Sequence, residues 1–235
     1  MADGFFITSI PKSGTHLLSS LVHLHTGQPC ISVKKDVVDF SRFADHLNLV
    51  GHWRSSQVRK REDLHALVAH RNLLIMVRDP RDICNSMLPY VLQSQNPLHQ
   101  AAAEKLRGLA YDEQIRLIAH GFSVEHASYG MPNVREACSG FSDLKRKLFP
   151  DARIFRYEDF FEEAKIVPLI AEAFSIGAKR ALDLTTRALT GESKTKRAGG
   201  ARPNQWRERF SPALKRMFAQ EYADVLEAFG YPIEE

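Results

Sequence analysis

The stretch that decides the fold is Phe5-Phe6-Ile7-Thr8-Ser9-Ile10, followed by Pro11-Lys12-Ser13-Gly14-Thr15-His16 and an apolar segment to Thr26. A short, mostly apolar run is typical of a strand buried in a parallel sheet, and the pattern over 15–26 is helical. A strand, a tight glycine-containing turn and a helix N-terminus together form an anion site, because backbone N–H groups and the helix dipole both point at the ligand. The alternative is an ordinary exposed turn at Lys12 and Ser13.

Strand and helix patterns alternate along the rest of the chain. Further apolar runs predict strands at 47–51, 73–77 and 152–157. Helical patterns cover 62–70, 81–92, 101–123, 134–149 and 211–229. This alternation predicts an α/β fold with three layers, α/β/α, around a central parallel sheet whose ligands bind at the carboxyl ends of the strands. The stretch 88–149 carries no strand signal, so we expect a helical insertion over the ligand cleft.

A second candidate anion site follows the predicted strand at 73–77. The sequence there is Arg78-Asp79-Pro80-Arg81-Asp82-Ile83-Cys84-Asn85-Ser86. Pro80 suits the first turn of a helix, which places Ser86 about two turns in. An arginine fork at the strand end and a hydroxyl on the helix can grip one phosphate. The alternative is a helix cap with Asp79 as N-cap and with Arg81 and Asp82 exposed to solvent.

The composition of the chain limits the class of protein and the kind of ligand that can be expected. The chain has 235 residues, is 44% hydrophobic, and carries 32 basic against 28 acidic residues, a net charge of +4. This mild charge fits an anionic small ligand and gives no indication of nucleic acid binding. Three widely spaced cysteines favour a reducing compartment, and no apolar stretch is long enough for a signal peptide or a transmembrane segment. We therefore expect a soluble, cytoplasmic protein.

The first loop differs from the phosphate loop of nucleoside triphosphatases. That loop reads G-x-x-x-x-G-K-[ST], with lysine after the second glycine. Here Lys12 precedes Gly14 and no earlier glycine is present in the loop. A magnesium-dependent kinase or NTPase is therefore disfavoured, although it remains the main alternative together with a non-catalytic nucleotide-binding module.

Four motifs in order resemble those of sulfotransferases that use 3′-phosphoadenosine 5′-phosphosulfate (PAPS). The residues from Pro11 to Thr15 resemble the family's 5′-phosphosulfate loop, and the segment from Arg78 to Ser86 resembles its 3′-phosphate motif. Arg156-Tyr157-Glu158-Asp159 resembles the strand end whose tyrosine lies against adenine. Arg197-Ala198-Gly199, followed by Trp206 and Phe210, resembles the last motif, with alanine where the family has lysine. The motifs span residues 11 to 211, so we expect a single sulfotransferase domain over 1–235, with a P-loop-like fold.

The resemblance implies a set of donor-binding residues. These are Lys12, Ser13, Gly14, Thr15, His16, Arg78, Ser86, Tyr157, Arg197 and Gly199. The segment between Arg197 and Trp206 is about two residues longer than usual for the family, so Arg202 is the alternative to Arg197 at the 3′-phosphate. The product of the donor would be adenosine 3′,5′-bisphosphate, and the family needs no metal. No metal site is expected.

Three residues are implied in catalysis. Lys12 would stabilise the leaving phosphate, and Ser86 would hold Lys12 away from the donor until the acceptor arrives. A base is also needed, and histidine is the natural choice near neutral pH. Of ten histidines, His52 follows the predicted strand at 47–51 and matches the family's base, although Gly51 stands where the family has Thr or Ser. The expected reaction moves a sulfuryl group to a hydroxyl or amine of a small-molecule, sugar or lipid acceptor. The acceptor and the oligomeric state are left open.

Overall fold

The computed structural model describes residues 4–34, 39–123, 130–131, 133–191 and 202–234. The chain divides into two compact units. The first comprises Met1–Arg78 and Gly140–Ala201, and the second comprises Asp79–Ser139 and Arg202–Glu235.

The first unit is built on a five-stranded parallel sheet with the order β2-β3-β1-β4-β7. Its strands are β1 (Phe5–Ser9), β2 (Cys30–Ser32), β3 (Asn48–Gly51), β4 (Asn72–Val77) and β7 (Arg153–Arg156). β1 lies between β3 and β4, with Phe5 opposite Asn48 on one side and opposite Asn72 on the other. The carboxyl ends of β1, β3 and β4 therefore meet at one edge of the sheet, which is where parallel sheets bind ligands.

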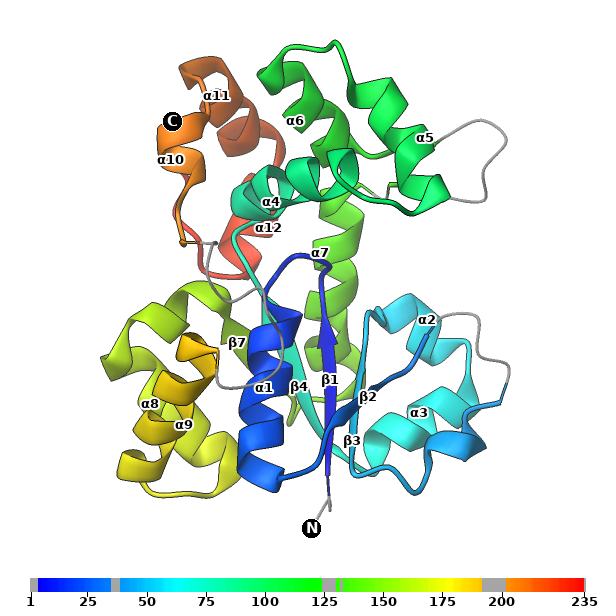
Figure 1. The fold of residues 1–235 in the computed structure, drawn as a ribbon, viewed down its shortest axis with the longest axis vertical. Coiled ribbons are helices and arrows are strands. Elements are labelled where there is room, and N and C mark those ends of the chain that lie inside the picture. The colour runs from blue at the N-terminus through cyan, green and yellow to red at the C-terminus, as the bar shows by residue number, and fades with distance from the viewer. Residues whose placement is uncertain (1–3, 35–38, 124–129, 132, 192–201, 235) are drawn as a thin grey trace. The chain divides into compact units, whose positions relative to one another are not determined.

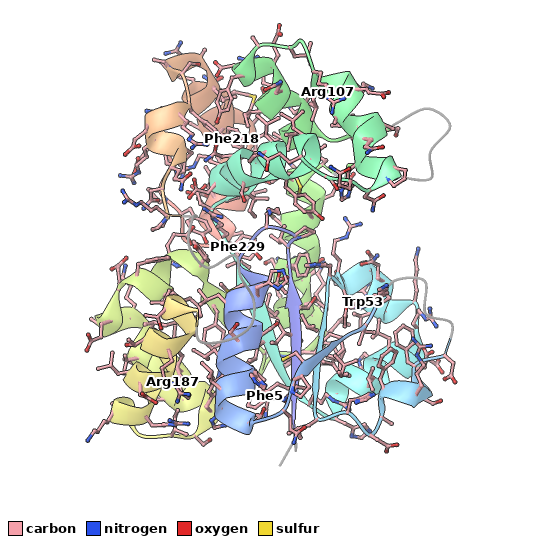
Figure 2. The ribbon with its side chains drawn as sticks, viewed as in Figure 1. Phe5, Trp53, Arg107, Arg187, Phe218 and Phe229 are labelled. Carbon is pink, nitrogen blue, oxygen red and sulfur yellow. The ribbon has the colours of Figure 1, made fainter. Side chains whose placement is uncertain are left out.

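The central strands β1 and β4 are buried on both faces because helices cover both. On one face, Phe5, Ile7 and Met76 share a core with residues of α1 (Thr15–Thr26), α8 (Glu163–Phe174) and α9 (Ala178–Thr190). Phe5 is labelled in Figure 2, beside α1. α2 (Ser55–Arg59) and α3 (Glu62–Ala69) connect β3 to β4, which flank β1, so this connection crosses the opposite face. The three-layer α/β/α architecture with a parallel sheet is confirmed (Figure 1).

The second unit is mainly helical. Its elements are α4 (Pro80–Leu92), α5 (Pro97–Leu106), α6 (Tyr111–His120), β5 (Phe122–Ser123), β6 (Gly130–Met131), α10 (Trp206–Arg209), α11 (Pro212–Glu221) and α12 (Ala223–Ala228). α7 (Val134–Asp143) begins in this unit, and its residues from Gly140 onward belong to the first unit. A π-helix (Leu144–Leu148) follows α7 directly. β5 and β6 form an antiparallel pair.

Several sequence expectations need correction. The helix expected at 101–123 is two helices, α5 and α6, with Gly108 at a positive φ of 84° between them. The stretch 88–149 was expected to hold no strand, and it contains β5 and β6. The helix expected at 211–229 breaks after Glu221, and α8 and α9 were not predicted at all. The four predicted strands are confirmed, with ends shifted by one residue at most.

Candidate functional site

The loop between β1 and α1 has a backbone shape that Ser13 holds in place. Lys12 and Gly14 both adopt positive φ, at 72° and 99°. Between them, the buried Ser13 donates its N–H to the Ile10 carbonyl at 3.1 Å, and its hydroxyl contacts the carbonyls of Ile10 at 2.6 Å and Met76 at 3.0 Å. The loop is thus tied to β4 as well as to β1. Ser13, expected to bind the donor, has its hydroxyl and its N–H engaged within the protein.

Gly14 gives Tyr157 room to pack against the loop. A Cβ on Gly14 would lie 2.5 Å from Cδ2 of Tyr157 and 2.8 Å from Cε of Met76. A side chain would therefore collide with a buried ring, and the positive φ would strain it further. Glycine at this position brings the loop backbone and the Tyr157 ring together.

The first turn of α1 is left without a side-chain cap. Gly14 is the N-cap residue, and no side chain in the described part of the chain caps this end. Thr15 and His16 are the first two residues of the helix, half-buried and exposed respectively. The Leu17 N–H already donates to the Gly14 carbonyl at 2.9 Å, so the N–H groups of Thr15 and His16 and the positive end of the helix dipole are the groups that can face an anion, with the Lys12 loop beside them.

His52 lies against the carboxyl end of β1. Its Nδ1 is 2.8 Å from the Ser9 carbonyl oxygen and 3.1 Å from the Ser9 hydroxyl. A carbonyl oxygen can only accept a hydrogen bond, so in the neutral ring the proton sits on Nδ1. The lone pair is then on Nε2, which is the atom that can take a proton from a substrate.

Trp53 anchors the segment that carries His52. Its N–H donates to the Thr8 hydroxyl at 2.9 Å, the Thr8 hydroxyl donates to the Trp53 carbonyl at 3.0 Å, and its indole donates to the Val33 carbonyl at 3.1 Å. Figure 2 labels Trp53 in the first unit. Gly51 makes this packing possible, because a Cβ there would lie 2.5 Å from Cδ1 and Nε1 of Trp53. The glycine in place of the family's Thr or Ser is therefore explained by the indole that folds back on it.

Arg78 stands at the end of β4, next to the same loop. Its guanidinium Nη1 donates to the Lys12 carbonyl at 3.4 Å, and its Cζ lies 4.6 Å from the centre of the Tyr157 ring. The side chain is buried, with an exposed fraction of 3%. A buried arginine stacked on an aromatic ring presents a fixed donor fork, which suits phosphate recognition.

The rest of the second motif belongs to the second unit. Asp79 is the N-cap of α4, as expected, accepting from the Arg81 N–H at 2.9 Å. The helix-cap alternative also expected Arg81 and Asp82 to be exposed to solvent, and this is wrong, because both are fully buried. Arg81 pairs with Asp79 at 2.7 Å and lies 3.6 Å from the centre of the Trp206 ring, while Asp82 accepts the N–H groups of Asn204 and Trp206 at 2.6 and 3.0 Å. These residues are structural.

The predicted site residues thus fall into three groups. The first unit brings together Lys12, Ser13, Gly14, Thr15, His16, His52, Arg78 and Tyr157. Ser86 lies half-buried on α4 and Arg202 lies before α10, both in the second unit. Arg197 and Gly199 lie outside the described residues. Sequence reasoning missed Ser9 and Trp53, which hold His52 by tertiary contacts and carry no local signal of that role.

The three cysteines are poor candidates for nucleophiles. Burial raises the pKa of Cys30 to about 11, and burial also raises the pKa values of Cys84 and Cys138 well above their usual range. A thiol reacts as its thiolate, so these side chains stay unreactive near neutral pH. No three metal-ligating side chains gather among the residues that the structure describes, and within those residues no helix is long and apolar enough to cross a membrane.

Comparison with known proteins gives a match only at the level of structure. No protein-family model and no curated protein sequence matches the chain. Mouse sulfotransferase SULT7A1, solved with PAP (adenosine 3′,5′-bisphosphate), superposes with a TM-score of 0.68 at 15% identity, over 96% of this chain and 85% of that one. Retinol dehydratase, solved with androsterone and inactive cofactor PAP, gives a TM-score of 0.63 at 13% identity, over 96% and 81%.

A second structure of retinol dehydratase, with retinol and PAP, gives a TM-score of 0.61 at 14% identity, over 96% of this chain and 82% of that one. At identities this low the likeness establishes the fold, and it covers nearly the whole chain. The chain therefore has the P-loop-like α/β fold of the sulfotransferases.

Proposed function

We propose that the chain is a PAPS-dependent sulfotransferase that moves a sulfuryl group to a hydroxyl or amine of a small-molecule, sugar or lipid acceptor. The donor is a mixed anhydride of sulfate and phosphate, and it supplies an activated sulfuryl group when bound. Transfer then needs a stabilised leaving phosphate, a base for the acceptor and an in-line arrangement of the two. Lys12 would meet the first of these needs and His52 the second.

The loop from Lys12 to His16 fits the 5′-phosphate end of the donor. Its shape is set before any ligand arrives, because Ser13 ties it to Ile10 and Met76. Uncapped N–H groups at the start of α1 would receive phosphate oxygens. The Lys12 ammonium would stabilise the charge that develops on the bridging oxygen of the leaving group.

The other end of the donor would be held by Arg78 together with the further residues that the family resemblance implies. Arg78 would bind the 3′-phosphate with its buried guanidinium, and Tyr157 would lie against the adenine. Ser86 would add a hydroxyl to the same phosphate and would restrain Lys12 before the acceptor binds. Gly199, with either Arg197 or Arg202, would complete the 3′-phosphate site.

His52 would act as the base. With its proton fixed on Nδ1 by the Ser9 carbonyl, its Nε2 would take the proton of the acceptor's hydroxyl or amine as the new bond to sulfur forms. This hydrogen bond is the observation that carries the proposal. It puts a histidine of defined tautomer at the end of β1, the strand that leads directly into the Lys12 loop.

The acceptor is the least constrained part of the proposal. The retinol dehydratase structures contain androsterone or retinol, which are small molecules. A small hydroxyl-bearing acceptor is therefore the first class to screen. The three cysteines are free thiols, which fits a reducing compartment and supports a cytoplasmic location.

Calorimetry tests the nucleotide specificity. The full chain should bind adenosine 3′,5′-bisphosphate without added metal, and bind it more tightly than it binds ATP with Mg²⁺. Tight binding of ATP–Mg²⁺ with no binding of the bisphosphate would replace the proposal with a kinase or NTPase.

Transfer of labelled sulfate from PAPS to a panel of hydroxyl and amine acceptors tests catalysis. Lys12→Ala and His52→Ala should each abolish transfer while the fold survives. Lys60→Ala and His70→Ala change exposed residues of the same unit and serve as matched controls with wild-type turnover. Bisphosphate binding with no transfer to any acceptor would indicate a non-catalytic nucleotide-binding module, and wild-type turnover in His52→Ala would remove that residue as the base.

A further inference from the structure

Ser9 links the candidate base to the donor loop. It is the last residue of β1 and is fully buried. Its carbonyl and its hydroxyl both face Nδ1 of His52, at 2.8 and 3.1 Å, and its hydroxyl lies 2.6 Å from the Thr15 hydroxyl. A continuous chain of polar atoms therefore runs from the imidazole through Ser9 to the first residue of α1.

The direction of each hydrogen bond between His52, Ser9 and Thr15 follows from the one that His52 makes with the Ser9 carbonyl. The Ser9 carbonyl oxygen can only accept, so Nδ1 of His52 carries a proton and donates it. The Ser9 hydroxyl oxygen accepts from the same N–H, as the second acceptor of a bifurcated hydrogen bond. The Ser9 hydroxyl proton is then left to donate to the Thr15 oxygen. The Thr15 hydroxyl proton is in turn directed away from Ser9.

We propose that Ser9 is a positioning residue that couples His52 to the donor phosphate, with its carbonyl fixing the tautomer and its hydroxyl orienting the Thr15 hydroxyl toward the anion. This inference rests on the proposed function, because Thr15 is assigned there to the 5′-phosphate. The N–H of His52 and the hydroxyls of Ser9 and Thr15 then all donate in the same direction, from the histidine to the phosphate. Aligned hydrogen bonds of this kind strengthen one another.

The coupling has a consequence that binding alone can measure, without a known acceptor. Ser9 acts on the phosphate only through Thr15. Removing the Ser9 hydroxyl therefore matters when the Thr15 hydroxyl is present and has no effect when it is absent. Residues in one hydrogen-bond network are expected to give such non-additive effects.

A double-mutant cycle in calorimetry with adenosine 3′,5′-bisphosphate tests this directly. Thr15→Val should weaken binding about 10-fold, because a hydrogen bond to a charged group is lost. Ser9→Ala should weaken binding about 3-fold, because the Thr15 hydroxyl loses its orientation. The double variant should bind like Thr15→Val alone. Losses that multiply in the double variant would overturn the coupling.

Two further variants separate orientation from general loss of a hydroxyl. Thr15→Ser keeps the hydroxyl and removes a methyl group, so it should bind the bisphosphate like the wild type. Thr185→Val removes a buried hydroxyl of the same unit that donates to its own helix at Ala181, and it should leave binding unchanged. A loss in Thr185→Val as large as that in Ser9→Ala would assign the effect to stability and overturn the proposal.

The tautomer gives a readout that is independent of nucleotide binding. In a ¹⁵N-histidine NMR spectrum of the nucleotide-free protein, assigned with His52→Gln, the neutral ring should carry its proton on Nδ1. A neutral ring with its proton on Nε2 would overturn the inference even if the bisphosphate binds. Failure to bind the bisphosphate would instead remove the proposed function, and the tautomer would still report whether Ser9 fixes His52. This measurement also stands if Ser9→Ala does not fold.

Discussion

Replacing Gly51 with alanine should disturb the whole segment that holds His52. The new Cβ would lie 2.5 Å from the Trp53 indole, whereas ordinary contact begins at 3.4 Å, so the ring would have to retreat by about 0.9 Å (3.4 − 2.5). Trp53 is buried and bonded at its backbone and its indole, so it cannot retreat without loosening the 3.1 Å bond to Val33. Overpacking and a weakened buried hydrogen bond together predict a loss of about 3 kcal/mol of stability.

Thermal unfolding followed by near-UV circular dichroism measures this loss. A destabilisation of this size lowers the melting temperature of a domain this large by about 6–12 °C. Gly177→Ala is the matched control, because nothing lies within 4 Å of a Cβ at that position and its φ of −70° suits any residue. The reasoning is refuted if Gly51→Ala melts within a degree of Gly177→Ala. Transfer activity should also fall in Gly51→Ala, since His52 is the next residue.

Three further outcomes are expected. Burial, and secondarily Arg180, lowers the pKa of His25, which stacks on Phe174 at 4.6 Å. Just below the unfolded-state pKa of about 6.5, the unfolded chain therefore binds more protons than the folded chain, and the free energy of unfolding should decrease as the pH falls from about 6.5. Urea titrations across pH 5–7.5 should show this decrease, and His25→Gln should reduce it. Asp79→Ala leaves the buried charge of Arg81 without its partner and should cost about 4 kcal/mol in the same titrations, and a cost below 1 kcal/mol would contradict the buried pair. Arg78→Lys should weaken adenosine 3′,5′-bisphosphate about 10-fold while leaving adenosine 5′-monophosphate unaffected, because only the former carries the 3′-phosphate; equal losses for both nucleotides would argue against that assignment.

The parts of the fold that the sequence predicts are those with strong local signals. The predicted strand at 73–77 is a continuous apolar run, and the weaker signals at 47–51 and 152–157 still place apolar side chains between polar ones. β2 was missed because it has three residues, none of them buried, at the edge of the sheet. α8 was missed because Pro168 lies inside it, which normally argues against a helix. α9 was missed although its buried residues recur at helical spacing, at Ala181, Leu184 and Ala188.

In the candidate site, too, the residues with a local sequence signal could be predicted and those held by long-range contacts could not. The Lys12 loop and Arg78 follow directly from strands that end at the same edge of the sheet, and His52 could be located by its place after a strand. The support for these residues comes from side chains that are distant in sequence. Trp53 contacts Thr8 and Val33, and Ser9 contacts His52 across 43 positions. Such contacts depend on how the strands pair, which a single sequence does not specify locally.

The way Ser13 holds the Lys12 loop has a consequence for any anion that binds there. Lys12 is kept in a left-handed conformation that costs a non-glycine residue about 1–3 kcal/mol. Because the bonds of Ser13 to Ile10 and Met76 impose that conformation, its cost falls on folding, and association with a nucleotide requires little further ordering. The affinity of the loop is therefore linked to the pairing of β1 with β4. Conditions that loosen this strand pair should weaken anion binding before the chain as a whole unfolds.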